Sequence, residues 1–242
     1  MKKLIALAAV SLLGPQLAWA GTGYYLISVY PDEGQKAVDF KYWNAKPDHS
    51  PPRSAPELGL SYNVTDSWYT EVSASWFKFS PGPTQYTGWE WQNDVLLTHG
   101  QYPIDVALHT TVERPLDRSE GYGLEWGPIM QTEMGRTQFN LNILFDRDYR
   151  TVANPMTMNY QWQVKYRWVP KLEFGVQGFG ELGKWDDWLP RDQQSHRAGP
   201  AVFGNWELGH KQAIKYEAAY LIGTNSARSA KSVAMRIQYI FF

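Results

Sequence analysis

Apolar and polar side chains alternate at every second position in about twelve segments of the chain, and this pattern limits the folds that the chain can adopt. The clearest segment is MNYQWQVKYRW at residues 158–168, which sets aromatic residues and a valine against amides and bases. Its apolar row is Tyr160, Trp162, Val164, Tyr166 and Trp168, and its polar row is Asn159, Gln161, Gln163, Lys165 and Arg167. Since successive side chains of a strand point to opposite sides of a sheet, each segment predicts a β-strand with one apolar and one polar face.

The connections between these segments alternate in length, which a soluble β-sandwich has no reason to do. Long connections rich in Pro, Asp, Arg and Ser, such as KPDHSPPRSAP and FSPGPTQY, alternate with short ones such as NVTDS, THGQY and EMGR. Transmembrane β-barrels have this arrangement, with short periplasmic turns and longer outside loops. We count about six long and about five short connections, which join about twelve strands and return both ends of the chain to the periplasm.

Residues 1–20 have the organisation of a secretory signal peptide. Two lysines precede an apolar run from Leu4 to Leu13, and the AWA triplet at residues 18–20 has small residues at the positions that cleavage requires. The apolar run is too short to span a membrane as a helix. We therefore expect residues 1–20 to be removed, which leaves residues 21–242 as one barrel domain.

Composition excludes several classes of protein. Without the two lysines of the signal peptide the 23 basic side chains fall to 21, against 24 acidic ones, and the resulting net charge of −3 does not favour nucleic acid as a partner. The chain has no cysteine, so disulfide scaffolds and thiolate metal sites are excluded. Since no phosphate loop, zinc spacing or dinucleotide fingerprint is present, we expect neither a cofactor nor a metal.

The chain ends on KSVAMRIQYIFF, a segment with one apolar and one mostly polar face. Its apolar row is Val233, Met235, Ile237, Tyr239 and Phe241. Together with the signal peptide and the alternating loops, the final IQYIFF resembles Gram-negative outer-membrane β-barrel proteins over essentially the whole mature chain. The segment HRAGPAVFGNWELGHKQAIKYEAAYLIG is also similar to small transporter-like barrels, although it does not fix a family.

The resemblance implies an all-β fold, namely a transmembrane antiparallel up-and-down β-barrel of about twelve strands with both termini periplasmic. In such proteins the last strand usually ends on Phe and carries a signal that the barrel-assembly machinery reads. That role falls here on Tyr239, Phe241 and Phe242, although Phe242 is one residue out of phase with the apolar row. The resemblance also implies contact with outer-membrane lipid and lipopolysaccharide.

The width of a barrel grows with its number of strands: side chains fill the interior of eight-stranded barrels, whereas sixteen-stranded barrels contain an open channel. Twelve strands give a lumen of intermediate width. We therefore expect a narrow passive channel for a small solute. By the alternation, about twelve acidic side chains face the lumen and about six basic ones, which predicts a mild preference for cations. The predicted lumen residues are Glu71, Glu90, Asp94, Asp105, His109, Glu125, Lys165, Arg167, Glu173, Glu181, Arg197, Glu217 and Arg236. We expect Lys165 and Arg167 to pair with Glu173 and Glu181 on the next strand.

Two other functions stay open. A non-conducting barrel with paired interior charges would serve a structural or surface-interaction role. A lipid-modifying enzyme would need a nucleophile and a base, for which Ser195 and His196 beside Asp192 are the candidates. Neighbouring residues of a strand point to opposite faces, which argues against that pair. The loop with Asp186 and Asp187 could bind calcium through its carboxylates, but a solvated acidic loop is the better interpretation.

Several positions leave the strand register or the role of a segment open. Residues 21–34 fit a periplasmic extension, a partial plug or an edge strand. Pro128 and Pro200 fall inside strands after a glycine, and we interpret them as bulges. The alternation turns Asn93 toward lipid and Phe179 toward the lumen.

The predicted sidedness can be tested by cysteine labelling on whole cells. Single cysteines at Pro83, Asp117 and Asp187 lie in outside loops, so they should react with a membrane-impermeant thiol reagent. A cysteine at Thr65, in a periplasmic turn, should react only after the cells are opened. The reverse pattern of labelling would invert the topology.

Overall fold

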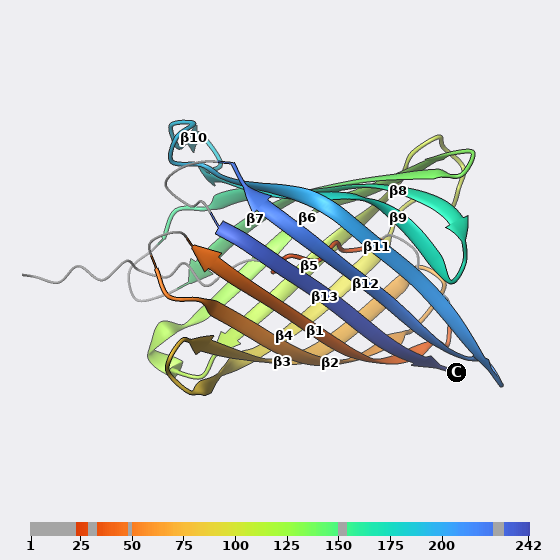
Figure 1. The fold of residues 1–242 in the computed structure, drawn as a ribbon, viewed down its shortest axis with the longest axis horizontal. Helices are drawn as coiled ribbons and strands as arrows, with labels where there is room; N and C mark the ends of the chain where they lie inside the picture. The colour runs from red at the N-terminus through yellow and green to blue at the C-terminus, as the bar shows by residue number, and fades with distance from the viewer. Residues whose placement is uncertain (1–22, 29–32, 48–49, 150–153, 225–229) are drawn as a thin grey trace, which may run out of the picture.

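The computed structural model describes residues 23–28, 33–47, 50–149, 154–224 and 230–242, and the predicted signal peptide lies outside them. The described chain is almost entirely β-structure (Figure 1). The strands are β1 (Lys36–Pro47), β2 (Arg53–Asn63), β3 (Trp68–Phe79), β4 (Thr84–Leu96), β5 (Asp105–Pro115), β6 (Tyr122–Met134), β7 (Thr137–Tyr149), β8 (Thr157–Val169), β9 (Leu172–Lys184), β10 (Asp187–Trp188), β11 (Ser195–Gly209), β12 (Gln212–Gly223) and β13 (Ala230–Phe241). One short 3-10 turn, η1 (Arg118–Glu120), follows β5. Within the described ranges, no helix is long and apolar enough to cross a membrane.

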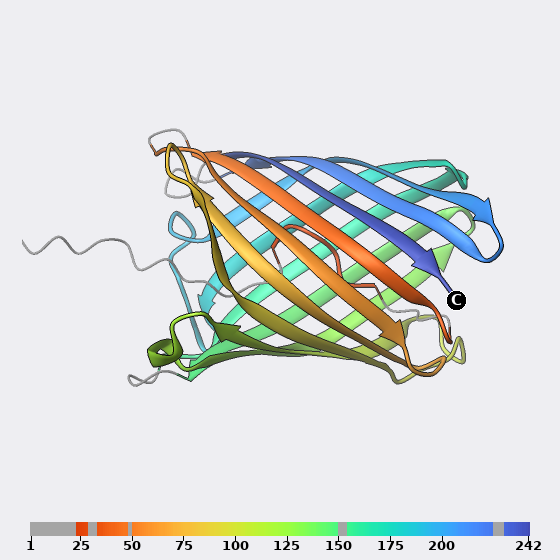
Figure 2. The same cartoon turned by 90° about the horizontal axis from the view of Figure 1, so that it is seen from below.

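The twelve long strands form a closed antiparallel barrel (Figures 1 and 2). Each strand pairs with the one before it, and β10 adds only a two-residue ladder to β9. The first and last strands close the barrel, from Lys36 opposite Phe241 to Pro47 opposite Ala230. The prediction of an all-β antiparallel barrel with about twelve strands is therefore confirmed.

The two ends of the barrel differ in their connections. At the end where β13 finishes, here called the turn end, β6 and β7, β8 and β9, and β11 and β12 are joined by two residues each. At the opposite end, the loop end, β9 and β11 are joined through residues 185–194. One pair of connections departs from the predicted alternation, since residues 97–104 at the turn end are longer than residues 80–83 at the loop end.

The departure has a local cause at the turn end. The Asp105 carboxylate accepts hydrogen bonds from the Thr98 hydroxyl at 2.9 Å and from the Gly100 N–H at 2.8 Å. These bonds fold the connection around the first residue of β5, so β4 ends at Leu96. The sequence THGQY therefore belongs to a longer, ordered turn, and the prediction of a short one was wrong.

The apolar rows of the strands face outward and the polar rows face inward. In β13, Val233 and Ile237 are 45% and 42% exposed, whereas Ser232 and Ala234 are 1% and 3% exposed. In β7 the buried residues are mainly amides and acids. This is the reverse of a soluble protein, and it is the distribution that a barrel surrounded by lipid needs.

The two prolines inside strands do not form bulges. The pairings of β5, β6 and β7 keep one register on both sides of Pro128, and those of β9, β11 and β12 do so around Pro200. A Cβ atom at Gly127 or Gly199 would lie 1.9 or 1.8 Å from a carbonyl oxygen of the neighbouring strand. The glycine before each proline thus lets that strand approach closely, and the ladder continues without an extra residue.

The alternation predicted the correct orientation of Asn93 and Phe179. Asn93 points outward, where its side-chain oxygen accepts a hydrogen bond from the Trp68 indole at 3.1 Å. This bond satisfies a polar side chain on an otherwise apolar surface. Phe179 is 6% exposed and points inward.

Closure by β13 predicts that its end is needed for assembly. Deleting Ile240–Phe242 removes the pairs of β13 with Lys36 and Ala37 of β1, so the amount of heat-modifiable barrel in outer-membrane fractions should fall. The control variant is Tyr102→Ala with Ile104→Ala, which removes exposed apolar side chains at the same end and leaves β13 intact. Normal amounts of the truncated barrel would refute a role for the C-terminal residues in assembly.

Candidate functional site in the barrel lumen

A network of paired charges covers the lumen side of β13, β1, β2 and β3, and we call it the charged wall. Its members are Asp39, Lys41, Glu57, Glu71 and Arg236. The Lys41 ammonium lies 2.7 Å from a carboxylate oxygen of Glu57 and 2.7 Å from one of Glu71. The Arg236 guanidinium donates to Asp39, with Nε 2.7 Å from Oδ2. Because these groups are nearly excluded from solvent, each charge needs its partners.

The chain makes room for this network at Gly59. A Cβ atom there would lie 2.6 Å from a carboxylate oxygen of Glu71, which folds over the β2 backbone. The Tyr69 hydroxyl donates a hydrogen bond to the other oxygen of the Glu71 carboxylate. The position of Glu71 is therefore fixed by a base, a hydroxyl and a glycine on three strands.

A second cluster surrounds a fully buried histidine on β5. His109 Nδ1 lies 2.5 Å from Asp94 Oδ1, and its Nε2 lies 3.3 Å from Glu125 Oε1. The Thr111 hydroxyl lies 3.1 Å from the same Nε2. A hydroxyl, an imidazole and a carboxylate in this order have the connectivity of a nucleophilic triad. However, Glu125 shares the nitrogen that would act as the base, and Thr111 is only 6% exposed, so the cluster fits an ion-paired network better.

On the lumen side of β6–β9, neutral amides bond to one another beside charged residues such as Glu125, Lys165 and Glu173, and we call this group of amides the amide wall. The bonds include Gln138 Nε2 to Asn140 Oδ1 at 2.7 Å and Gln177 Nε2 to Gln163 Oε1 at 2.8 Å. An amide carries both donors and acceptors, so a row of amides can satisfy itself without counter-ions. The wall consists of Gln131, Gln138, Asn140, Asn142, Gln161, Gln163 and Gln177.

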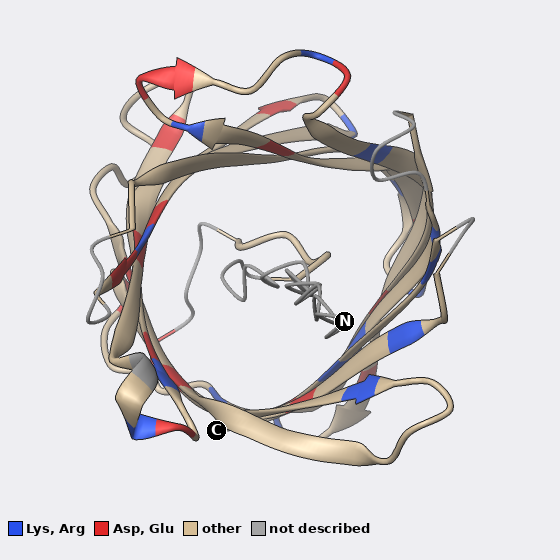
Figure 3. Ribbon diagram, turned by 90° about the vertical axis from the view of Figure 1, so that its left-hand side faces the viewer, with Lys and Arg blue, Asp and Glu red and all other residues tan. Residues whose placement is uncertain are grey.

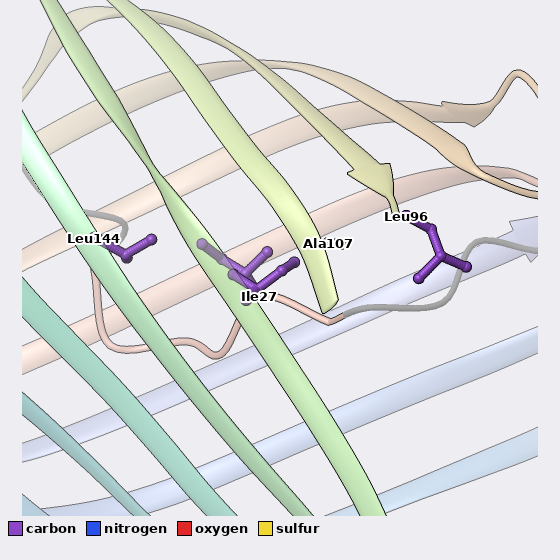
Figure 4. Packing of buried hydrophobic residues seen from close by; sticks show 5 residues of the cluster. Ile27, Leu96, Ala107 and Leu144 are labelled. Carbon is purple, nitrogen blue, oxygen red and sulfur yellow. The ribbon is translucent and has the colours of Figure 1, made fainter. Parts of the chain in front are cut away.

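Residues Tyr24–Ile27, the plug segment, lie inside the barrel between these walls (Figures 2 and 3). Ile27 is 5% exposed and packs in an apolar socket made by inward-facing residues of β4–β7 (Figure 4). The socket residues are Leu96, Ala107, Ile129 and Leu144. The Ile27 N–H donates to Gln161 Oε1 at 3.3 Å, and its carbonyl accepts from Asn142 Nδ2 at 3.1 Å. The amide wall therefore binds the backbone of the plug segment.

The other end of the plug segment contacts a different part of the wall. The Tyr24 ring makes edge contacts with Trp43 of β1 and Phe179 of β9, at centroid distances of 5.3 and 5.8 Å. The Arg197 guanidinium lies 4.7 Å from the centre of the same ring. Tyr24 also packs against the buried cluster of Phe179, Ala201, Phe203, Ala219 and Leu221.

Between these anchors, Tyr25 contacts the charged wall. Its hydroxyl donates to Glu57 Oε2 at 3.2 Å, and the Lys41 ammonium lies 5.4 Å from the centre of its ring. Of the three roles considered for residues 21–34, the described part therefore takes that of a partial plug. Residues 21, 22 and 29–32 lie outside the described residues.

The plug segment leaves a small polar cavity beside it. The cavity has a volume of about 60 Å³ and is bounded by residues 25–28 and by side chains of the charged wall. Its lining includes both signs of charge, with Glu90, Asp94 and Lys215 in addition to Lys41 and Arg236. A passage through this part of the lumen is thus narrow and strongly polar.

The structure places the residues predicted to line the lumen in these features or near them. Glu71 and Arg236 belong to the charged wall, and Asp94, His109 and Glu125 form the histidine cluster. Glu217 lies opposite Arg236 on the neighbouring strand, and Glu181 lies opposite Ser195. Glu90 accepts a hydrogen bond from the Ser75 hydroxyl, Arg197 donates one to Ser232, and Asp105 holds the turn before β5.

The expected pairing across the β8–β9 hairpin is found for one of the two bases. Lys165 lies 3.0 Å from Glu173, as the spacing predicts. Arg167 instead forms a two-pronged ion pair with Glu133 of β6, and it also donates to Gln138. Its long side chain reaches past β7 because β7 presents the amide of Gln138 at that level.

The socket for Ile27, the aromatic socket formed around Tyr24 by Trp43, Phe179 and Arg197, and the other residues that the plug segment binds were not predicted from the sequence. One signal was available, because Leu144 interrupts the polar row of Gln138, Asn140, Asn142 and Asp146 in β7. An apolar residue on a lumen face needs an apolar partner. Nothing in the local sequence identifies Ile27 as that partner.

The outer rim does not bring the candidate hydrolase residues together. Ser195 is buried on the lumen side, whereas His196 bonds to the Tyr160 hydroxyl at 2.7 Å and to Gln194 at 2.9 Å. The two side chains point to opposite faces of β11. Over the described ranges, no three His, Asp or Glu side chains are placed to hold a metal ion, and this includes Asp186, Asp187 and Asp192.

The fold and the polar lumen define a closed twelve-stranded β-barrel of the outer-membrane type. Solved structures agree, and the likeness is one of fold because sequence identity is low. An outer-membrane channel from Pseudomonas putida F1 is similar over 92% of this chain and 98% of its own, with a TM-score of 0.60 and 10% identity. The NanC porin is similar over 85% of this chain and 99% of its own, with a TM-score of 0.57 and 11% identity.

A third similar structure is the translocator domain of the autotransporter NalP from Neisseria meningitidis. It covers 88% of this chain and 89% of its own, with a TM-score of 0.56 and 7% identity. No protein-family model matches the sequence, and no curated protein matches it. The comparisons therefore give the fold of outer-membrane channels and porins without a specific family.

The charged wall makes a prediction about stability. Among the described residues, replacing Lys41 with methionine leaves the buried Glu57 carboxylate without a base and leaves Glu71 with only Arg236, at 3.8 Å, which should lower the free energy of unfolding by about 3–5 kcal/mol. The control is Lys231→Met, which removes the same charge from an exposed position on β13. Urea unfolding of the barrel in lipid vesicles, followed by tryptophan fluorescence and heat modifiability, measures both. Equal stability of the two variants would contradict the buried network.

Proposed function

We propose that this protein is a narrow passive channel of the bacterial outer membrane. The observation that carries the proposal is a closed barrel with an apolar outer surface and a lumen of polar and charged side chains. The apolar surface suits a lipid bilayer, and the predicted signal peptide supports export through the inner membrane. In this orientation the turn end faces the periplasm and the loop end faces outside.

The solute is a small polar molecule that moves down its gradient. The cavity beside the plug segment has a volume of about 60 Å³ and a polar lining, which favours small polar solutes over large ones. The lining has donors, acceptors and both signs of charge, so it can replace the hydration of a polar solute in steps. The pathway needs no cofactor and no energy source.

A mild preference for cations follows from acids that face each other on β4–β7. Glu90 lies directly opposite Glu113, and Glu125 lies opposite Asp146. Among the residues that the structure describes, no base is within ion-pair distance of Glu90 or Glu113. Facing carboxylates repel each other, and a passing cation relieves that repulsion.

The alternative function is a non-conducting barrel with a structural or surface-interaction role. The observation that favours it is the plug segment itself, because its contacts and the paired charges fill much of the lumen. Conduction separates the two functions, since a filled barrel passes no ions in any state.

Recordings in a planar bilayer test the channel and its selectivity together. Purified barrel should give discrete conductance steps, and its reversal potential in a potassium chloride gradient should favour potassium. Glu90→Gln with Glu113→Gln should lower the potassium preference, by about three-fold for each charge, since a charge about 6 Å from an ion contributes ~0.7 kcal/mol in water. The potassium preference of the unchanged barrel should grow as pH rises and more carboxylates ionise.

The matched control neutralises two exposed acids of the connection between β9 and β11, Asp187→Asn with Asp192→Asn. It should leave the reversal potential unchanged. A folded barrel that shows no conductance, including after plug removal, would support the structural role instead. A preference for chloride would contradict the cation preference and leave the channel proposal intact.

A further inference from the structure

We infer that the lumen contains a binding site for a short peptide, which the plug segment Tyr24–Ile27 occupies as a tethered ligand. Release of this segment widens the channel. Only one part of the inference, the widening of the channel on release, rests on the proposed channel function. The binding site itself is defined by contacts with the barrel wall.

The first part of the site is the socket for Ile27. Its residues stand at inward positions of four consecutive strands, where the neighbouring inward residues are amides, acids and a histidine. Ile129 and Leu144 are 0% exposed in the presence of Ile27. Such an apolar patch would face water in an empty polar lumen, so the patch and the isoleucine stabilise each other.

The second part of the site recognises the peptide backbone. Asn142 and Gln161 bond to each other at 3.0 Å, and together they bond to the N–H and the carbonyl of Ile27. A side-chain amide has the same donor and acceptor groups as the peptide it binds. The pair therefore holds the backbone of one residue in place and does not require a particular side chain.

The third part is the aromatic site for Tyr24, which Trp43, Phe179 and Arg197 form on three other strands. An aromatic ring between two edges and a guanidinium is a specific contact, since aliphatic residues lack the π-face that the cation needs. The ligand class is thus a short peptide with an aromatic residue three positions before an aliphatic one.

The two sockets lie on different sides of the lumen, with Ile27 against β4–β7 and Tyr24 against β1, β9 and β11. The backbone of the plug segment lies in the middle of the lumen (Figure 3), and its Tyr24 and Ile27 side chains contact different parts of the wall. A chain fixed at both sides obstructs passage between them. Release from either socket should widen the passage, and a free peptide of the same type should close it again.

The test replaces the segment without changing the length of the chain, as Tyr24→Ser, Tyr25→Gly, Leu26→Ser and Ile27→Gly. The full-length variant should show single-channel conductance at least about two-fold above the unchanged barrel, because the obstruction is gone. The synthetic peptide Tyr-Tyr-Leu-Ile, capped at both ends, should then lower the conductance of this variant in a saturable way. A scrambled capped peptide, Ile-Tyr-Tyr-Leu, is the peptide control.

A second variant acts from the wall and leaves the plug segment untouched. Ala107→Leu fills the socket, so Ile27 loses its place and conductance should rise. Its control is Ala74→Leu on β3, which makes the same change on the outward face. If the barrels conduct, equal conductance of the unchanged barrel and both plug-releasing variants would overturn the inference, as would a peptide that has no effect on a conducting variant.

A measurement without ion flow separates this inference from the channel proposal. The chain has no cysteine, so Leu26→Cys, at a position only 6% exposed, introduces a single thiol in the plug segment. The thiol should react slowly with a small maleimide in the folded barrel and several-fold faster when Ala107→Leu is added. Slow and fast reaction in barrels that never conduct would support the seated peptide and refute the channel. Equal rates would overturn the seated peptide, whatever the conductance.

Discussion

Closure of the barrel by pairing β1 with β13 is the constraint on which the rest of the structure depends. In an apolar environment an unpaired N–H or carbonyl costs several kcal/mol, so a sheet is stable there only if it has no free edge. The ladder from Lys36–Phe241 to Pro47–Ala230 removes that edge. It also orders Ile240 and Phe241, because they pair with Ala37 and Lys36 of β1.

In the closed barrel the apolar rows face outward and the polar rows face the lumen. The polar side chains must therefore find their hydrogen-bond and ion-pair partners inside the lumen. The barrel does this in two ways. On β13 and β1–β3, charges pair with charges, and Gly59 gives the Glu71 carboxylate the space to do so. On β6–β9, amides bond to amides and carry no net charge. A pathway between these walls meets paired charges on one side and, on the other, a row of amides with charged residues such as Glu125 and Lys165 beside it, so a solute finds polar contacts on both sides.

The strand faces could be predicted from the sequence because burial on one side leaves a row at every second residue, as in β7 and β8. What depended on contacts between distant strands could not. The turn at residues 97–104 follows from bonds to Asp105, and the straight ladder at Pro128 follows from a close approach that only Gly127 permits. Arg167 pairs with Glu133 two strands away because the residue between them is an amide. Within the candidate site, the acids and bases could be placed on the lumen face, whereas the socket for Ile27 required four strands in register.

Closure of the barrel also explains why the plug segment does not pair as a further strand of the sheet. Tyr24, Tyr25 and Ile27 have strong strand propensity, and such a segment beside an open sheet would pair with its edge. Once β13 has paired with β1 the barrel offers no edge, so the backbone of the segment must find other partners. Asn142 and Gln161 provide them at Ile27, and the side chains enter the two sockets. The amides that satisfy the lumen wall are thus the groups that recognise a peptide inside it. A polar lumen lined with amides is therefore suited to bind the backbone of a short peptide.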